Sequence, residues 1–230
     1  MRIGVVNFSG NVGKSTVAKH LLQPRVGGQL IEVETFNQSE GGDLSIRGKN
    51  FGELQEYLQE VDEAVVDVGA SNVDDFFKLM KQYHGSHEDF DYFVIPVVKE
   101  EKQQKDTIAT IEALSALGIP AQKMRLVFNK LDTDDSVEDS FPAILNYVKS
   151  EKKCVARTDA AIVTTQVFEK LKPLQKTIEE ILADTTDYRA KMKGVESEDE
   201  KAHCRAMISA QRLAYSANEN LDAVYRSLFK

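Results

Sequence analysis

The stretch IGVVNFSGNVGKSTVAKHLL (residues 3–22) decides the fold of this chain. Its apolar start, IGVV, is typical of a buried strand, and the VAKHLL pattern predicts a helix. Between them, glycines let the backbone turn its N–H groups toward phosphate oxygens, and the helix adds the positive end of its dipole. Lys14 would reach the β- and γ-phosphates and Ser15 would ligate Mg²⁺. The predicted phosphate-binding residues are Ser9, Gly10, Asn11, Val12, Gly13, Lys14, Ser15 and Thr16.

A second motif supports this loop. The run EAVVDV (63–68) places Asp67 near the end of a predicted strand, with Gly69 two residues later. A carboxylate in this position binds Mg²⁺ through water, and a glycine there can approach the γ-phosphate. The alternative is an aspartate that only caps the loop. The match to the standard phosphate loop is incomplete, because Phe8 stands where that pattern has its first glycine.

Short apolar runs alternate with helix-like segments along the body of the chain. This order implies βαβ units, and we expect an α/β P-loop NTPase fold with a mostly parallel sheet flanked by helices. Ligands of such sheets bind beyond the carboxyl ends of the strands. The predicted strands are residues 3–6, 29–33, 63–68, 91–98 and 124–129, and the predicted helices are 15–23, 50–60, 73–83, 102–117 and 137–150.

Strand signals stop at about Val167, so we expect a P-loop NTPase domain over 1–183 and a C-terminal helical extension over 184–230. Ser197 and Glu200 have the spacing of a capping box that starts the last helix. Packing of that helix on the sheet domain is favoured over a dimer or partner surface. Residues of its apolar stripe recur every seven positions, at Met207, Ala214, Leu221 and Leu228, with Ile208, Gln211, Tyr215, Val224 and Tyr225 near the same stripe.

The loop FSGNVGKST resembles the deviant Walker A loop, KGGxGK[ST], of the ParA/MinD family of partition and positioning ATPases. The segments FGELQEYLQ, VVDVGASN, SHEDFDYFVIP and KDTIATIEAL are similar to plasmid stability members of that family. The resemblance implies a bacterial, plasmid-encoded protein that acts in plasmid maintenance and conjugation, beside a small DNA-binding partner from the same operon. In the family a leading lysine reaches across a homodimer that sandwiches the nucleotides. Ser9 stands in its place and Asn11 replaces the second glycine, which puts the dimer chemistry in doubt.

By the same resemblance, Glu32 and Glu34 take the places of two acidic residues that follow the second strand in the family. Their chemistry is to coordinate the water shell of Mg²⁺ and to orient or deprotonate the attacking water. Residues two apart on a strand point to one face, so both can face the site. The Gly-rich segment GGDLSIRGKN (41–50) suits a switch loop. The implied catalytic residues are Lys14, Glu34 and Asp67, and the implied metal ligands are Ser15, Glu32 and Asp67.

The stretch VFNKLD (127–132) leaves the identity of the base open. Its Asn129 resembles the asparagine that contacts adenine in ParA/MinD-like proteins. However, Asn129, Lys130 and Asp132 also form the N-K-x-D motif of many GTPases, in which the aspartate pairs with the edge of guanine. The resemblance favours ATP, and GTP is the alternative.

Composition narrows the class of protein. The 230 residues are 42% hydrophobic and 29% charged, with a mean hydropathy of -0.35, which is typical of a globular chain. The net charge of -8 comes from the body, where 29 acidic residues face 21 basic ones up to Ala183. This balance argues against a nucleic-acid binder that acts alone, so we expect DNA contact to be indirect.

The N-terminal stretch and the cysteine usage favour the cytoplasm, and the family resemblance implies a bacterial one. We expect neither a signal peptide nor a transmembrane span, since no run of about 18 apolar residues occurs. The cysteines, Cys154 and Cys204, lack metal-site spacing and fit a reducing compartment. The C-terminal NLDAVYRSLFK is amphipathic, but it carries only Arg226 and Lys230 as positive charges, which disfavours a membrane-surface anchor.

Three functions follow from these observations. The leading hypothesis is an ATP hydrolase whose nucleotide state switches its assembly, with ATP and Mg²⁺ as cofactors. The second is a non-hydrolysing nucleotide-binding adaptor that links a plasmid DNA-binding partner to another surface. The third, based on Asn129 to Asp132, is a regulatory GTPase.

Overall fold

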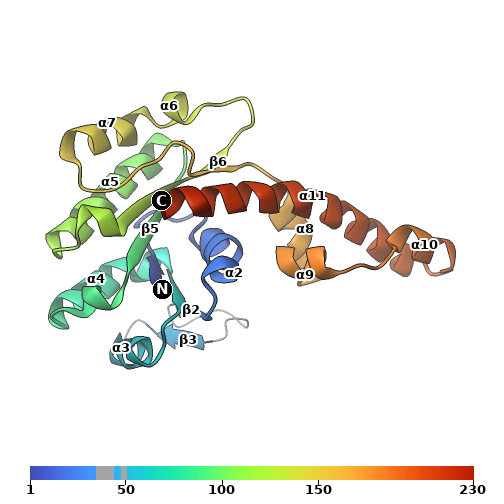
Figure 1. Ribbon diagram of the computed structural model, residues 1–230, viewed down its shortest axis with the longest axis horizontal. Helices are drawn as coiled ribbons and strands as arrows, with labels where there is room; N and C mark the ends of the chain where they lie inside the picture. Colours follow the sequence, from blue (N-terminus) through green and yellow to red (C-terminus); the bar gives the residue numbers. More distant parts are fainter. Residues whose placement is uncertain (35–43, 48–50) are drawn as a thin grey trace.

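The sheet at the centre of the molecule is parallel throughout (Figure 1). The computed structural model describes residues 1–34, 44–47 and 51–230, and in this part of the chain the sheet has seven strands in the order β3-β2-β4-β1-β5-β6-β7. This arrangement confirms the predicted α/β class. The strands are β1 (Arg2–Val5), β2 (Gln29–Glu34), β3 (Leu44–Arg47), β4 (Ala64–Val68), β5 (Tyr92–Val97), β6 (Met124–Leu131) and β7 (Ala161–Val163).

The two edge strands, β3 and β7, were not predicted. β3 falls inside the segment 41–50 that was expected to be a switch loop, and the rest of that expectation lies outside the described residues. β7 has only three residues, and a register irregularity interrupts its pairing with β6 between Phe128 and Leu131. Strands of three or four residues are too short to show a periodic pattern in the sequence. They are stabilised mainly by pairing with a neighbouring strand, which the local sequence does not show.

The helices between the strands lie close to the predicted ranges, with one exception. The segment expected as one helix over 137–150 is two helices, because Phe141 separates them and Pro142 supplies no backbone N–H to continue the first. The helices up to this point are α1 (Lys14–Thr16), η1 (Val17–Leu22), α2 (Gln23–Val26), α3 (Phe51–Glu60), α4 (Val73–Gln82), α5 (Glu101–Ala116), α6 (Val137–Ser140) and α7 (Pro142–Glu151), with short 3₁₀ turns at Ala70–Asn72, Ser86–Asp89 and Ala121–Lys123.

Both faces of the sheet are covered. Alternate strand residues enter two separate cores, as in β4, where Val66 packs on the α3, α4 and α5 side and Val65 packs on the other side. The second core joins η1 and α2 to the C-terminal helices α8 (Val167–Leu174), α9 (Ile178–Ala183), α10 (Tyr188–Lys193) and α11 (Glu198–Leu228). The sheet is therefore sandwiched, as the buried apolar runs of its strands require.

The helix that follows the phosphate loop is widened in its middle. α1, η1 and α2 are continuous, and η1 is a π-helix in which the Gln23 N–H donates to the Ala18 carbonyl, five residues back. Pro24 has no N–H to donate to the His20 carbonyl, so a regular α-helix cannot be completed here. The Arg25 side chain donates to the carbonyls of His20 and Leu21 instead, at 3.0 and 3.1 Å.

The long helix α11 packs as its apolar stripe predicted. Met207, Ala214, Leu221 and Leu228 are all at most 2% exposed, whereas Tyr215, also assigned near the stripe, is 67% exposed and points away from the core. α11 contacts α8, α9 and α10 and crosses β6, β7 and η1. Its first half projects beyond the sheet (Figure 1).

The prediction that α11 starts after Ser197 is confirmed, but the predicted capping box does not form. Ser197 is the N-cap residue, but its side chain makes no capping hydrogen bond. A complete capping box starts α9 instead, where Thr177 and Glu180 bond to each other's backbone N–H.

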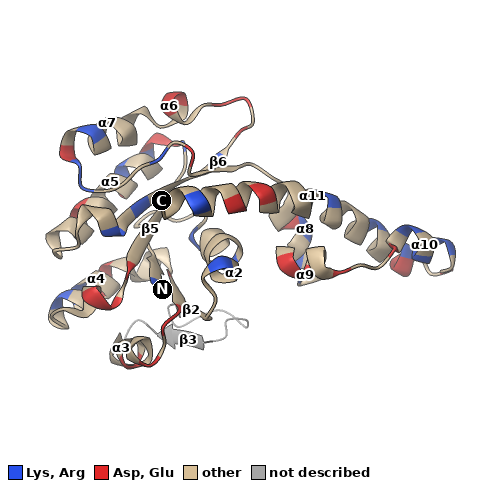
Figure 2. Ribbon diagram, in the orientation of Figure 1, with Lys and Arg blue, Asp and Glu red and all other residues tan. Residues whose placement is uncertain are grey.

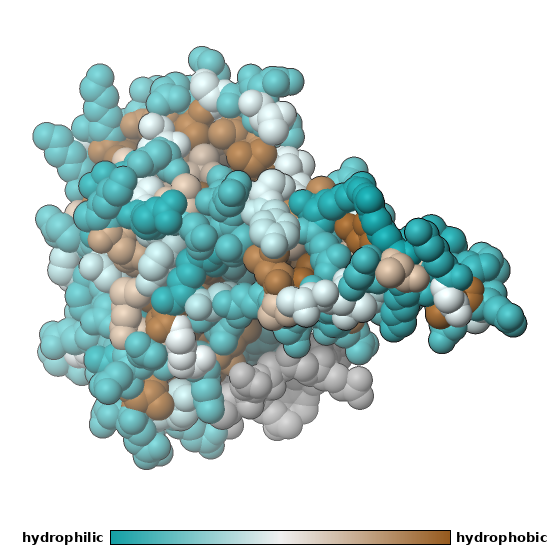
Figure 3. Space-filling view, turned by 45° about the vertical axis from the view of Figure 1, so that its right-hand side comes forward, coloured by the Kyte–Doolittle hydropathy of each residue, from teal (hydrophilic) through white to brown (hydrophobic). Residues whose placement is uncertain are grey.

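The projecting part of α11 has a mainly hydrophilic surface with mixed charge, since its first turn holds Glu198, Asp199 and Glu200. Lys201, Arg205 and Arg212 lie in a stretch, 201–218, that holds no acidic residue (Figure 2). Teal side chains cover most of this part in Figure 3, with isolated brown ones between them. Within the described ranges, no helix combines the length and the apolar character needed to cross a bilayer.

Candidate functional site

The loop after β1 has the backbone of a phosphate cradle. Asn11 and Gly13 have φ of 59° and 87°, in the left-handed region. Asparagine tolerates this region better than most residues, which accounts for Asn11 at a position where the resembling family has glycine. A Cβ added at Gly13 would lie 2.1 Å from Asn129 Nδ2, so no larger residue fits. Gly10 is exposed, and a Cβ there would meet no described atom within 4 Å.

Lys14 lies inside the loop. It is 7% exposed, and its Nζ donates to the carbonyls of Ser9 at 2.7 Å and Asn7 at 3.1 Å. Burial lowers the pKa of Lys14 to about 8, and the negative charge of Asp67 opposes that shift. An ammonium group therefore lies in the cradle, close enough to Asp67 to interact with it.

Asn7 joins the loop to the neighbouring elements, and the sequence analysis did not single it out. This fully buried side chain accepts from the Ser9 N–H at 2.8 Å. Its Nδ2 donates to the Pro96 carbonyl at 2.9 Å and to Thr107 Oγ1 at 2.8 Å. The only local signal was a polar residue directly after an apolar strand. Because buried amides are stable only when their hydrogen bonds are made, Asn7 holds the loop in place against β5 and α5.

Asp67 and Glu32 lie side by side at the carboxyl ends of β4 and β2. The two residues are paired in the parallel register, and Val5 of β1 pairs with Asp67 on the other side. Asp67 is 6% exposed, whereas Ser15 at the start of α1 is exposed. Glu34 closes β2 in register with Arg47 of β3, and its side chain lies outside the described part.

Gly69 requires its small size. Its N–H donates to the Val33 carbonyl at 3.1 Å, and a Cβ would lie 3.2 Å from that oxygen and 3.2 Å from Asn72 Nδ2. Asn72 is 2% exposed and donates to the same carbonyl at 2.9 Å. These bonds fasten the segment after β4 to β2, so Asn72 is a further residue that the sequence analysis missed.

The carboxyl end of β6 lies against the phosphate loop. Asn129 is 3% exposed and its Nδ2 donates to the Val12 carbonyl at 2.8 Å. Lys130 has a φ of 57°, and its Nζ donates to the Asn11 carbonyl at 3.1 Å. Both side chains therefore connect the candidate base-recognition segment directly to the cradle.

Asp132 is contacted by Lys99 and Thr164, which lie just after the two strands that flank β6. Lys99, which follows β5, lies 2.7 Å from Asp132 Oδ2 and 3.4 Å from Asp135 Oδ2. The hydrogen bond from Lys99 lowers the pKa of Asp132, and a hydrogen bond from the side chain of Thr164, just after β7, acts in the same direction. Lys99 and Thr164 were not predicted, because they lie far from Asp132 in the sequence.

A groove of about 470 Å³ opens beside the cradle. Its aromatic part is formed by His20 and Phe168, whose ring centroids are 5.1 Å apart. Burial, with a smaller contribution from Lys19, lowers the pKa of His20 to about 4, so this imidazole is neutral at pH 7. The groove runs between the helix after the loop and α8, and it is lined by Ser15, Thr16, Lys19, His20, Phe168, Leu171, Lys172, Gln175 and Lys176.

The comparisons with known proteins agree with this fold. No protein-family model matches the chain, and no curated protein sequence matches it significantly. Among solved structures, the MinD cell division protein of Aquifex aeolicus has a TM-score of 0.52 at 12% identity, over 96% of either chain. Apo McdA from Cyanothece has a TM-score of 0.51 at 13% identity, over 91% of this chain and 98% of that one. A Borrelia burgdorferi B31 protein assigned to plasmid partition, bound to AMPPNP, has a TM-score of 0.50 at 12% identity, over 91% and 97%. At such identities the similarity establishes the fold alone, which is the P-loop NTPase fold that these structures share.

Proposed function

We propose that the protein binds a nucleoside triphosphate with Mg²⁺ and hydrolyses it as a ParA/MinD-like ATPase. The observation that carries this proposal is the cradle: a left-handed loop at a helix N-terminus, with the Lys14 ammonium inside it and Asp67 beside it. The AMPPNP bound to the structurally similar Borrelia protein supports ATP as the nucleotide.

The residues present fit Mg²⁺. Magnesium prefers oxygen ligands and is held by one or two carboxylates or hydroxyls together with water and substrate phosphates. The Ser15 hydroxyl and the adjacent carboxylates of Asp67 and Glu32 provide that set. Among the described residues no group of three or more His, Cys, Asp or Glu forms a metal cage. Mg²⁺ would neutralise charge on the phosphates.

Each residue of the site has a proposed role. Lys14 exchanges its carbonyl partners for the β- and γ-phosphate oxygens, and the loop N–H groups from Gly10 to Thr16 bind the remaining oxygens. Glu34, at the end of β2, positions the attacking water, and Gly69 lets the backbone approach the γ-phosphate. Asn129, Lys130 and Asp132 recognise the base, next to the cradle that Asn129 and Lys130 touch.

The biological role is proposed from similarity. The chain resembles the plasmid stability protein StbB in VVNFSGNVGKST, FGELQEYLQ and KDTIATIEAL, which supports a role in plasmid stability and conjugation in the bacterial cytoplasm. Its partners would be a small DNA-binding protein of the same operon and a second copy of the chain. Ser9 carries no charge, so a homodimer would need contacts other than the family's leading lysine. The solved MinC:MinD complex, similar in fold, supports a partner-dependent assembly.

Phosphate release tests the proposal. Wild type, Lys14→Ala and the exposed control Lys78→Ala are compared, with and without DNA and the operon partner, after their thermal unfolding curves are matched. We expect turnover in wild type and Lys78→Ala and its loss in Lys14→Ala. Equal rates in all three proteins would refute hydrolysis at this site.

Two alternatives give other results. Tight nucleotide binding without turnover under every partner condition would support the non-hydrolysing adaptor, for which Ser9 in place of the leading lysine is the motivation. The N-K-x-D segment is the motivation for a regulatory GTPase, since Asn129 and Lys130 both contact the cradle. Preferential binding of GTP over ATP would support it.

A further inference from the structure

We propose that Lys99 sets the base preference of this site by occupying the Asp132 carboxylate and thereby disfavouring guanine. The inference rests on the proposed nucleotide-binding function and deepens it. It assigns a role to a lysine outside every motif that the sequence analysis recognised, and it favours ATP over GTP on structural grounds.

The position of Asp132 follows from the strands around it. Asn129 and Lys130 fasten the carboxyl end of β6 to the cradle through the carbonyls of Val12 and Asn11. Asp132, two residues further on, faces Lys99 from the end of β5 and Thr164 from the end of β7, and the Thr164 N–H donates to the Leu131 carbonyl at 2.8 Å. Hydrogen bonds to the phosphate loop and to Thr164, just after β7, therefore hold the backbone next to Asp132, and with it the position of the Asp132 carboxylate.

A free carboxylate in this position selects guanine. The Watson–Crick edge of guanine carries two adjacent N–H donors, and an ionised carboxylate has two acceptor oxygens that can receive both. Adenine presents one N–H donor beside N1, which is an acceptor. The negative charge of a free carboxylate repels the lone pair of that N1 atom. Discrimination of this kind is large when the polar group of the site has no other partner.

In this protein the carboxylate has another partner. Lys99 Nζ lies 2.7 Å from Asp132 Oδ2, and the same ammonium lies 3.4 Å from Asp135 Oδ2. Guanine would have to share or displace this contact to bond both oxygens. The ammonium also balances the charge that would repel adenine N1, so the same contact makes the site more tolerant of adenine.

The size of the effect follows from exposure. The side chains of Lys99, Asp132 and Asp135 are 44%, 52% and 39% exposed, so each ion pair is of the solvent-screened kind. Exposed ion pairs are weak, so the expected shift in the ratio of GTP to ATP affinity is about 1.4-fold to fivefold. Lys99 therefore biases the base preference and does not enforce it absolutely.

The test is a double-mutant cycle on base preference. Dissociation constants for Mg·ATP and Mg·GTP are measured by titration calorimetry for wild type, Lys99→Met, Asp132→Asn and Lys99→Met/Asp132→Asn. Methionine keeps the length of the side chain, and the Lys99 carbonyl that accepts from Gln104 Nε2 is unaffected. Lys102→Met, an exposed lysine of α5, is the matched control.

We expect Lys99→Met to raise the affinity for GTP relative to ATP by about 1.4-fold to fivefold, and Lys102→Met to leave the ratio unchanged. The gain must vanish in the double variant, since it requires the freed carboxylate. An unchanged ratio in Lys99→Met, or a gain that persists without Asp132, would overturn the inference. Failure of the wild type to bind either nucleotide would instead refute the proposed function itself.

Discussion

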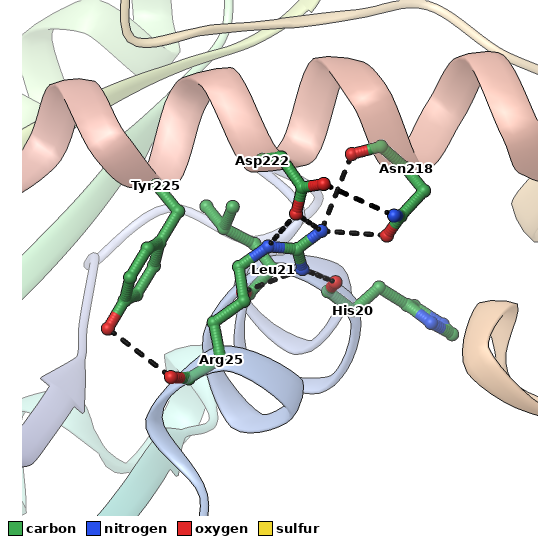
Figure 4. Close-up of polar contacts among 6 residues, drawn as sticks. All are labelled: His20, Leu21, Arg25, Asn218, Asp222 and Tyr225. Carbon is green, nitrogen blue, oxygen red and sulfur yellow. Dashed lines mark hydrogen bonds and ion pairs between the residues drawn. The ribbon is translucent and has the colours of Figure 1, made fainter.

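Replacement of Arg25 by methionine tests how the phosphate-loop helix is attached to α11. Figure 4 shows the Arg25 guanidinium between the two helices. Its Nε and Nη2 lie 2.8 and 2.7 Å from Asp222 Oδ1, and its Nη2 donates to Asn218 Oδ1 at 2.8 Å. The same group donates to the carbonyls of His20 and Leu21, and Pro24 leaves the first of these without its regular helical donor. Methionine keeps much of the apolar stem and removes every one of these bonds.

The expected loss of stability is about 2–4 kcal/mol. A hydrogen bond to a charged group contributes about 1.5–3 kcal/mol, and breaking a buried pair costs about 3–5 kcal/mol. The Arg25 side chain is only 12% exposed, but Asp222 is 42% exposed, and water can solvate the carboxylate that is left behind. Discounting the ion pair for this exposure leaves the carbonyl and Asn218 contacts as the larger part of the loss.

Urea unfolding measures this loss. At a slope of about 2–3 kcal/mol per molar urea, the midpoint of Arg25→Met should fall by about 1 M. Arg226→Met, an exposed arginine on α11, is the control and should shift it by less than about 0.2 M. In a cycle with Asp222→Asn, the coupling energy between the two residues should be about 1 kcal/mol. A midpoint for Arg25→Met equal to that of Arg226→Met would refute the reasoning.

Three further predictions concern the site and the core. Because burial and Lys19 lower the pKa of His20 from 6.5 to about 4, the unfolded chain takes up this proton first. The free energy of unfolding should therefore fall by about 1 kcal/mol per pH unit between pH 6.5 and 4, and His20→Gln should remove this part of the dependence, as followed by urea titrations at several pH values. Gly13→Ala, with a φ of 87° and a Cβ 2.1 Å from Asn129 Nδ2, should abolish nucleotide binding, whereas Gly10→Ala, whose Cβ meets no described atom within 4 Å, should retain most of it in the same calorimetric assay. Burial raises the pKa of Cys154 to about 12, and Cys154 and Cys204 are 6% and 1% exposed, so neither thiol should react with a disulfide reagent at pH 8 before unfolding; rapid labelling of the native protein would contradict this.

Much of the fold could be predicted because its signals are local. The strands β1, β2, β4, β5 and β6 are apolar runs between helical patterns, and each was placed to within a few residues. β3 and β7 were missed because a strand of three or four residues at the edge of a sheet depends on its neighbour. The break at Phe141 could have been predicted from Pro142, which was a local signal that was overlooked.

The residues of the candidate site also divide into those that local patterns predicted and those that were missed. The predicted residues Asp67 and Glu32 are adjacent on neighbouring strands, and Asn129 and Lys130 touch the phosphate loop. Asn7, Asn72 and Lys99 were missed, since an asparagine or lysine in isolation has no pattern that separates a bracing side chain from a solvated one. Their partners become visible only when strand ends distant in sequence are brought together.

The sequence by itself determined the phosphate loop. Its strand, its left-handed turn at Asn11 and Gly13 and its helix depend on the conformational preferences of consecutive residues. Only the tertiary structure decided what surrounds that loop. The parallel sheet places Lys99 on Asp132, and α11 places Asp222 on Arg25, 197 residues away in the chain. The physical reason is range: backbone preference acts over a few residues, whereas ion pairs and hydrogen bonds act over a few ångströms, whatever the separation in sequence.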